Sequence, residues 1–224
     1  MNASYGRSDA LHVRADIQGP IRLPAPALDA LLGAVVVLRD GVSPAAHEAE
    51  VVPLSIPIAR EPGGRFYLAS FGQCLPESRE LRYQHKRFPV EEAQMFGRDI
   101  KRVQINAGPA KSCRIPYDTA LLAGDRVDWW CIGDAEEMSA LLSHVSHLGK
   151  RRGVGLGQVR RWHVEPCDPW GVGFPVVRDG TALRTLPADW PDLRDDAPRG
   201  YGVIDMPYWM QSRSIICALP QVAS

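Results

Sequence analysis

At 224 residues, the chain is long enough to bury a substantial core, and its 45% apolar and 23% charged residues are ordinary for a soluble globular protein. No apolar run is long enough to cross a bilayer. The five cysteines are scattered, with no Cys-x-x-Cys pair, which argues against a disulfide framework and against a cysteine-rich zinc site. We therefore expect a reduced, cytoplasmic protein with no membrane partner.

The charged residues are unevenly distributed, although the formal net charge is zero. Between Leu81 and Arg114 there are eight Lys or Arg residues against three acids, and from Gly149 to Trp162 there are five Lys or Arg residues and no acid. Acidic residues gather elsewhere, notably between Asp189 and Asp196. Two basic islands on a neutral chain indicate a protein that binds a polyanion on one face and meets protein partners on others.

The first part of the chain predicts one strand followed by one helix. Residues 11–17 alternate apolar and polar side chains, which is the period of a half-buried strand. After a proline-marked turn, apolar residues recur at helical spacing from Leu28 to Val36, so we predict a helix over residues 27–38.

The chain from this helix to residue 125 predicts an inserted β region. Two β-rich runs, residues 51–59 and 65–71, flank a turn that contains Pro62-Gly63-Gly64, which is a hairpin signal. Residues 81–88 and 101–105 are predicted as further strands.

Residues 126–148 predict a strand and then a helix. The strand over residues 127–132 ends at Gly133, and Asp134 is expected to cap the helix, with Glu137 closing a capping box. One apolar stripe continues to Leu148, so Gly149 is expected as the residue just after the helix.

A glycine-rich basic loop at residues 150–157 leads into a strand predicted over residues 158–165. Strand, helix, loop and strand form the second half of a ferredoxin-like βαββαβ unit, whose first half is the earlier strand, helix and hairpin. The rest of the chain is rich in Pro, Gly and Asp up to a final strand at residues 213–219. We therefore predict one α+β domain over residues 1–224, with a ferredoxin-like (RRM-like) core at 10–38 and 126–165, an inserted β region at 39–125 and a C-terminal extension at 166–224.

The loop combines two features that suit a phosphate backbone. Three alternating glycines let the backbone take positive φ and approach another backbone closely, and three consecutive cations attract phosphate. The loop follows a helix and lacks a Gly-Lys-Ser/Thr ending, so it is neither a Walker loop nor a dinucleotide fingerprint. A flexible, solvated turn with incidental charge is the alternative.

Part of the chain resembles the RAMP superfamily of CRISPR-associated proteins. The resemblance is carried by Asp128–Gly133, by the capped helix ending in Leu148-Gly149-Lys150-Arg151-Arg152, by Gly153-Val154-Gly155-Leu156-Gly157, and by Arg161–Pro166. Leu28–Leu32 is similar to the first helix of the subunit that binds the 5′ handle in type IV systems. The fold that this resemblance implies is a ferredoxin-like RAMP core with a glycine-rich loop after its last helix.

The resemblance implies a subunit of a type IV effector complex that has no reaction of its own. It implies that the protein binds the 5′ handle of a guide RNA and contacts the backbone RAMP subunit and the large subunit, near the place where the target DNA duplex enters. A helicase that acts with the complex is a further partner. The implied RNA contacts in the loop are Lys150, Arg151, Arg152, Gly153, Gly155 and Gly157.

The segment Arg82–Phe88 mixes cations with two aromatic rings, a combination that holds single-stranded RNA by stacking and phosphate contacts. The alternative is a charged outer face of a strand. The candidate RNA contacts here are Arg82, Tyr83, His85, Lys86 and Arg87, with Lys101 and Arg102 farther along the chain. Lys111 and Arg114 could extend the same basic surface.

Two other functions remain open. A metal-independent endoribonuclease that processes guide RNA would use His85, His144 or His147 as general acid or base. A structural protein without RNA contact would use the basic islands to meet acidic partners. No His-x-x-x-His or clustered carboxylate pattern indicates a metal, and we expect no cofactor. Of the adjacent Trp129 and Trp130, we expect one in the core.

Overall fold

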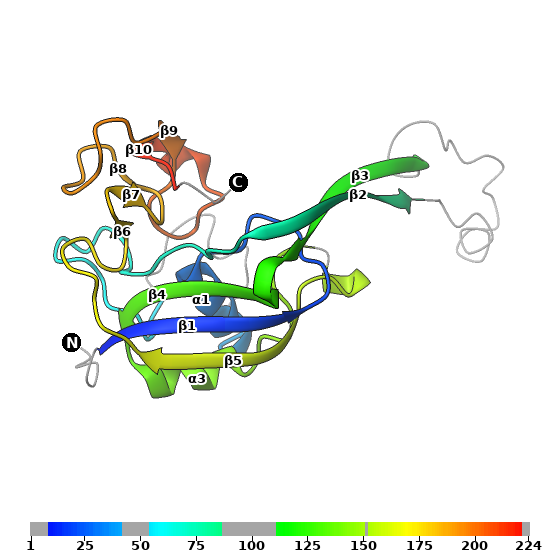
Figure 1. Ribbon diagram of the computed structural model, residues 1–224, viewed down its shortest axis with the longest axis horizontal. Coiled ribbons are helices and arrows are strands. Elements are labelled where there is room, and N and C mark those ends of the chain that lie inside the picture. The colour runs from blue at the N-terminus through cyan, green and yellow to red at the C-terminus, as the bar shows by residue number, and fades with distance from the viewer. Residues whose placement is uncertain (1–8, 42–53, 87–110, 151, 221–224) are drawn as a thin grey trace.

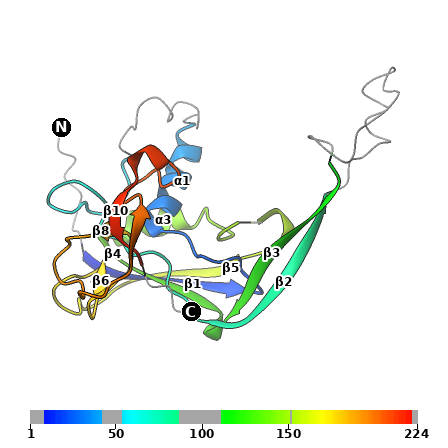
Figure 2. The same cartoon turned by 90° about the horizontal axis from the view of Figure 1, so that it is seen from above.

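The computed structural model describes residues 9–41, 54–86, 111–150 and 152–220. Its centre is a three-stranded antiparallel sheet with the order β4-β1-β5, formed by Arg126–Gly133, Asp9–Gln18 and Gln158–Pro166. The central strand β1 pairs with both neighbours, and its register with β5 shifts between Asp16 and Ile17. Two helices lie on one face of this sheet (Figures 1 and 2). No described helix covers the other face, here called the open face, where Trp170 packs against Trp130 (Figure 1). The protein is therefore of mixed α+β class, as predicted.

Strand β1 and helix α1 (Leu28–Arg39) confirm the local predictions within two residues at each end. Every second side chain of β1 from Leu11 to Ile17 is buried under the helices, which is the alternation that predicted the strand. Leu28, Leu32 and Val36 of α1 are at most 3% exposed, so one stripe of the helix closes the core over the sheet.

Helix α3 (Ala135–Leu142) begins where the sequence predicted and ends earlier. The Asp134 carboxylate accepts a hydrogen bond of 2.9 Å from the Glu137 backbone N–H, so the predicted N-cap is confirmed. The prediction that the helix runs to Leu148 was wrong. After Leu142 the backbone bonds tighten to the i−3 pattern, and Ser143 bonds the carbonyl of Ala140, which competes with helix continuation.

The described segment that follows α1, residues 54–75, contacts the outer edge of β4 through isolated bridges. The predicted turn exists, because the Glu61 carboxylate accepts hydrogen bonds from the backbone N–H groups of Gly63 and Arg65. The predicted strands on either side of the turn were wrong in the described part, since only single bridges such as Arg60–Tyr67 and Ala69–Cys131 form. Pro57, which has no N–H to donate, interrupts the pairing. Residues 51–53 of the first predicted strand lie outside the described residues.

Strands β2 (Pro76–Lys86) and β3 (Cys113–Leu122) pair into a long antiparallel ribbon, here called the arm. The arm projects away from the central sheet in both views (Figures 1 and 2). Most of its side chains are exposed, and only its base near Thr119 to Leu122 joins the core. The strand predicted over residues 101–105 lies outside the described residues.

The C-terminal extension forms a small second layer of short strands. They are β6 (Val177–Arg178), β7 (Thr181–Ala182), β8 (Leu186–Pro187), β9 (Arg199–Gly202) and β10 (Ile215–Ala218), arranged as a β8-β10-β9 sheet and a β6-β7 pair. The predicted final strand is confirmed as β10. The described residues also form short 3₁₀ helices: η2 (Ala123–Asp125), η3 (Arg152–Val154) and η4 (Gln211–Arg213).

A buried polar cluster joins this extension to helix α1. Asp29 and Arg184 are both 0% exposed, and the Arg184 Nη2 lies 3.4 Å from the Asp29 Oδ2. The Tyr208 hydroxyl donates to the same carboxylate oxygen at 2.6 Å and accepts from Arg184 at 2.7 Å. Because a buried charge is costly without a partner, moving the extension away from α1 would leave both charges unpaired.

Candidate nucleic-acid interface

The glycine-rich loop is held at its C-terminal end. Leu156 is 3% exposed, and the Gly157 N–H donates to the Pro20 carbonyl at 2.9 Å. Gly157 has φ +67°, and a Cβ there would lie 2.3 Å from the carbonyl oxygen of Leu148. Only glycine fits this position, so one of the three predicted glycines is required by a close approach of two backbones.

The exposed tip of the loop lies just before this anchored end. Gly153, Val154 and Gly155 are all exposed, and a Cβ on either glycine would meet open space, although Gly155 has φ +81°. Lys150 is also exposed. Arg151 and the side chain of Arg152 lie outside the described residues. The tip therefore presents backbone that a phosphate can approach closely.

The arm carries the second group of predicted contacts. The Arg114 guanidinium lies over the Tyr83 ring, with its Cζ 3.5 Å from the ring centroid. His85 pairs with Arg114 across the two strands, so by the alternation of β-strands Tyr83, His85 and Arg114 share one face. Arg114 was considered only as an extension of the basic surface. Its contact with Tyr83 depends on cross-strand register, which no short-range pattern contains.

The other face of the arm carries Arg82 and Lys86. Arg82 forms an exposed ion pair with Glu80 at 2.9 Å, which weakens its attraction for a further anion. Arg87, Lys101 and Arg102 lie outside the described residues. The candidate contacts on the arm are thus divided between two faces rather than gathered on one.

One short segment connects the loop to the arm. The Pro20 carbonyl accepts from Gly157 of the loop, and Ile21 exchanges two backbone hydrogen bonds, of 2.9 and 2.8 Å, with Ala120 at the base of β3. The loop, yellow-green in Figure 1, accordingly lies at the same end of the central sheet as the arm, and Figure 2 agrees. Pro20 and Ile21 therefore fix the loop and the base of the arm at one end of the sheet, and the cations Arg82, Lys86 and Arg114 lie farther along the arm (Figure 1).

The three histidines of the ribonuclease hypothesis lie on two separate parts of the chain. His85 is exposed on the arm, whereas His144 and His147 follow helix α3. The His147 Nδ1 lies 3.0 Å from the Ser146 hydroxyl. Among the described residues, no hydrogen bond or ring contact joins any two of these three imidazoles, so they do not form an acid–base pair.

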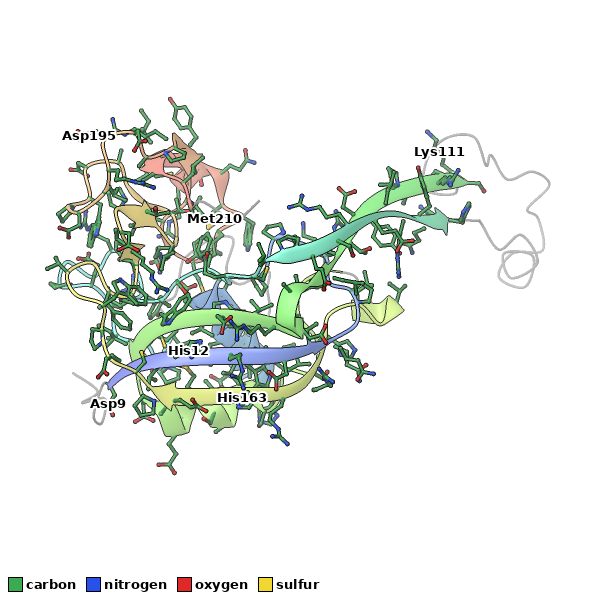
Figure 3. The ribbon with its side chains drawn as sticks, in the orientation of Figure 1. Asp9, His12, Lys111, His163, Asp195 and Met210 are labelled. Carbon is green, nitrogen blue, oxygen red and sulfur yellow. The ribbon has the colours of Figure 1, made fainter. Side chains whose placement is uncertain are left out.

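Two histidines that sequence reasoning missed are paired with carboxylates on the open face of the sheet. His12 lies 2.8 Å from Asp128, and His163 lies 2.9 Å from Asp16; Figure 3 labels both histidines on this face. The hydrogen bond from His163 holds the pKa of Asp16 below its ordinary value. The alternation of β1 predicted that His12 and Asp16 face away from the core, but it did not predict which side chains of β4 and β5 they contact.

The tryptophans are divided between core and surface. Trp129 is 0% exposed and its indole N–H donates to the Pro26 carbonyl, whereas Trp130 stacks on His12, which confirms that one of the pair is in the core. Trp162 donates to the Val145 carbonyl. Trp209 is 59% exposed.

Comparison with known protein families identifies the family of this chain. The family described as CRISPR type IV associated protein Csf3 matches residues 83–220, a range that begins in the arm and includes the loop and the C-terminal extension. No curated protein matches the chain. No helix among the described ranges could span a bilayer. Since the match covers more than half of the 224 residues, the chain belongs to the Csf3 family of CRISPR type IV associated proteins.

Proposed function

We propose that this protein is the non-catalytic subunit that holds the 5′ handle of the guide RNA in a type IV CRISPR ribonucleoprotein of the cytoplasm. In this role it contacts the backbone RAMP subunit and the large subunit, close to the target DNA duplex and to a helicase that acts with the complex. The observation that carries the proposal is the connection through residues 20–22, which fixes the glycine-rich loop and the base of the arm at one end of the sheet.

The strand order supports a ferredoxin-like RAMP core. A βαββαβ unit places its first strand in the middle, antiparallel to the strands before and after its second helix. β1 has this position between β4 and β5, and the segment before the arm bridges the outer edge of β4 at Ala69 and Gln73. The bridged segment then takes the place of the second strand of the βαββαβ unit. The arm is an insertion before the third strand of that unit, which is β4.

The two basic elements would hold RNA in different ways. The exposed loop tip lets a phosphate approach Gly153 and Gly155, with Lys150 beside it. On the arm, Tyr83 is 39% exposed and has Arg114 over its ring, so it can stack a base while the guanidinium compensates phosphate charge. Contacts between the loop and the RNA phosphates would supply affinity, and contacts between the arm and the RNA bases would supply specificity for the handle.

The test compares RNA binding by the wild type and by a variant with Lys150, Arg151 and Arg152 changed to Ala. Fluorescence anisotropy would measure affinity for a guide RNA with its repeat-derived 5′ end, and for the same RNA without that end, from 50 to 200 mM salt. Each lost phosphate contact lowers the salt slope by about 0.7 for single strands, so the variant should lose roughly 2. A matched control removes three exposed cations of the C-terminal extension, Arg178, Arg194 and Arg199.

The outcomes separate the three functions. Weaker binding only by the loop variant, with a preference for the handle in the wild type, supports the proposal. Equal binding of both RNAs, or an unchanged salt slope, contradicts it and favours the protein-binding alternative. Cleavage of RNA by the wild type without added metal, abolished by changing His85, His144 or His147 to Ala, would favour the ribonuclease.

A further inference from the structure

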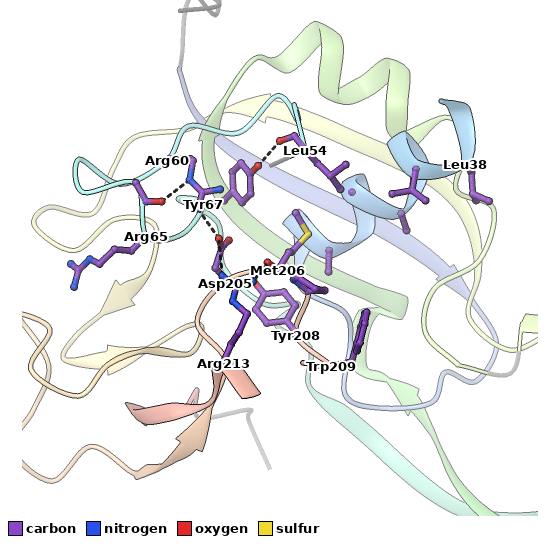
Figure 4. Close-up of a pocket in the computed structure, with 16 residues that line it drawn as sticks. Leu38, Leu54, Arg60, Arg65, Tyr67, Asp205, Met206, Tyr208, Trp209 and Arg213 are labelled. Atoms are coloured by element: carbon purple, nitrogen blue, oxygen red, sulfur yellow. Dashed lines mark hydrogen bonds and ion pairs between the residues drawn. The ribbon is translucent and has the colours of Figure 1, made fainter. Parts of the chain in front are cut away.

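A large open groove lies between helix α1 and the segment before β10, at the opposite side of α1 from its buried stripe. Its volume is about 1280 Å³, and Figure 4 shows its walls. Ala34, Val37 and Leu38 of α1 form one wall, and Met206 and Trp209 of the C-terminal extension form the other. The groove therefore joins two parts of the chain that are about 170 residues apart.

Part of the apolar lining of this groove faces solvent as far as the described residues extend, whereas Leu54 and Met206 pack partly on the core. Leu38 is 80% exposed and Trp209 is 59% exposed, and Ala34 is also exposed. Since α1 already buries Leu28 and Leu32 in the core, it is apolar on two faces, of which the described part of the chain covers only one. A contiguous apolar surface of this kind on a soluble protein marks a binding site.

One end of the groove is polar and carries excess positive charge. Arg60, Arg65 and Arg213 line it, and Asp205 is the only carboxylate among its lining residues. Arg60 lies 2.7 Å and Arg213 lies 3.9 Å from the Asp205 carboxylate, while Arg65 pairs with Glu61 at 3.0 Å. Three cations against these two carboxylates leave one positive charge. Each guanidinium has five N–H donors, so this end can accept a further carboxylate.

The size and polarity of the groove decide what kind of ligand fits. Its volume exceeds the roughly 300–1,000 Å³ of small-molecule pockets, and its walls are mainly apolar with cations at one end only. A nucleic acid would need cations along its whole path. We propose that the groove receives an apolar segment of another protein subunit of the type IV complex, with a carboxylate that meets Arg60 and Arg213. This rests on the part of the proposed function that makes the chain a subunit of a larger complex.

The test blocks the groove without disturbing the RNA-binding elements. Ala34→Arg places a long side chain on the exposed wall of α1, and Trp209→Ala removes an exposed aromatic ring from the other wall. The matched controls are Val172→Arg, at a residue 83% exposed, and Tyr201→Ala, at a residue 78% exposed, neither of which lines the groove. Binding of the full-length variants to each purified protein subunit of the complex would be measured by surface plasmon resonance, beside guide-RNA affinity and urea unfolding.

We expect both groove variants to weaken binding of one subunit at least tenfold, with the controls unchanged and RNA affinity within twofold of the wild type. Unchanged binding of every subunit, or no binding by the wild type, overturns the inference. A clear loss of stability of the isolated Ala34→Arg protein would also overturn it, because the groove would then be filled from within the chain. If RNA binding fails in the wild type while the groove variants still lose a subunit, the handle proposal falls and the groove proposal stands.

Discussion

Changing Asp29 to Asn should remove a large share of the stability of this protein. The carboxylate is 0% exposed and accepts hydrogen bonds from the Tyr208 hydroxyl and the Ala30 N–H, at 2.6 and 2.9 Å. Its ion-pair partner Arg184 is also 0% exposed. The substitution keeps the size of the side chain, removes its charge and replaces one accepting oxygen with an N–H donor, so the loss combines both changes without creating a cavity.

The size of the expected stability loss follows from the contacts that the Arg184 guanidinium keeps in the variant. Arg184 still donates to the carbonyls of Ala69 and Ile204, so its hydrogen bonds are largely kept, but its charge loses the carboxylate paired with it. Breaking a buried ion pair by removing one partner costs about 3–5 kcal/mol. Since whole domains are stable by about 5–15 kcal/mol, the loss is a substantial fraction of the total.

Urea unfolding followed by circular dichroism would measure this loss. With a typical slope of about 2 kcal/mol per molar, a loss of 3 kcal/mol lowers the midpoint by roughly 1.5 M. Asp40→Asn is the control, because Asp40 ends the same helix and forms only an exposed pair with Arg39; it should leave the midpoint unchanged. A change below about 0.5 kcal/mol for Asp29→Asn would refute the view that this cluster holds the C-terminal extension on α1.

Three further predictions concern the loop, the arm and the buried cluster. Gly157→Ala should destabilise the protein by about 1–3 kcal/mol in urea unfolding, because of its positive φ and the nearby Leu148 carbonyl, whereas Gly153→Ala should not; equal effects would contradict the close approach. Tyr83→Ala should weaken guide-RNA binding in anisotropy assays by about 1–3 kcal/mol, roughly 5- to 150-fold, with Tyr83→Phe close to the wild type; loss in both would argue against stacking. Burial, and then the charge of Asp29, raise the pKa of Tyr208 well above its ordinary value near 10. The stability contributed by the neutral Tyr208 hydroxyl is therefore complete below about pH 10 and is lost as the pH rises through the folded-state pKa. Tyr208→Phe should flatten this alkaline decline in the free energy of unfolding, and an unchanged decline would contradict the prediction.

Local patterns in the sequence predicted the elements whose residues contact their chain neighbours. β1 and α1 follow from the alternation at 11–17 and the helical spacing at 28–36, and the start of α3 follows from the Asp134 cap. The same reasoning failed at the end of α3, because the apolar stripe continues through Val145 and Leu148 although both are buried outside the helix. Burial alone does not distinguish a helix from a folded-back turn that packs on the same core.

The sequence predicted the candidate site as two separate groups of residues, but it did not predict how these groups lie relative to each other. The glycine spacing and the cations of the two basic islands are visible in the sequence, and so is the resemblance to the family that the comparison then showed. That Pro20 and Ile21 connect the loop to the arm depends on pairings more than 90 residues apart. The Tyr83–Arg114 contact likewise depends on the register of two strands.

The sequence by itself determined the α+β class, the positions of β1 and α1, the start of α3 with its Asp134 cap, and the type IV CRISPR family. Each is contained in spacing or in a contiguous motif. Only the tertiary structure decided that Asp29 meets Arg184 across 155 residues, that His12 and His163 pair with carboxylates on the open sheet face, and that α1 leaves a second apolar face along a groove. The physical reason is that these contacts depend on which elements pack together, and packing satisfies buried charges and apolar surfaces with residues that no local period connects.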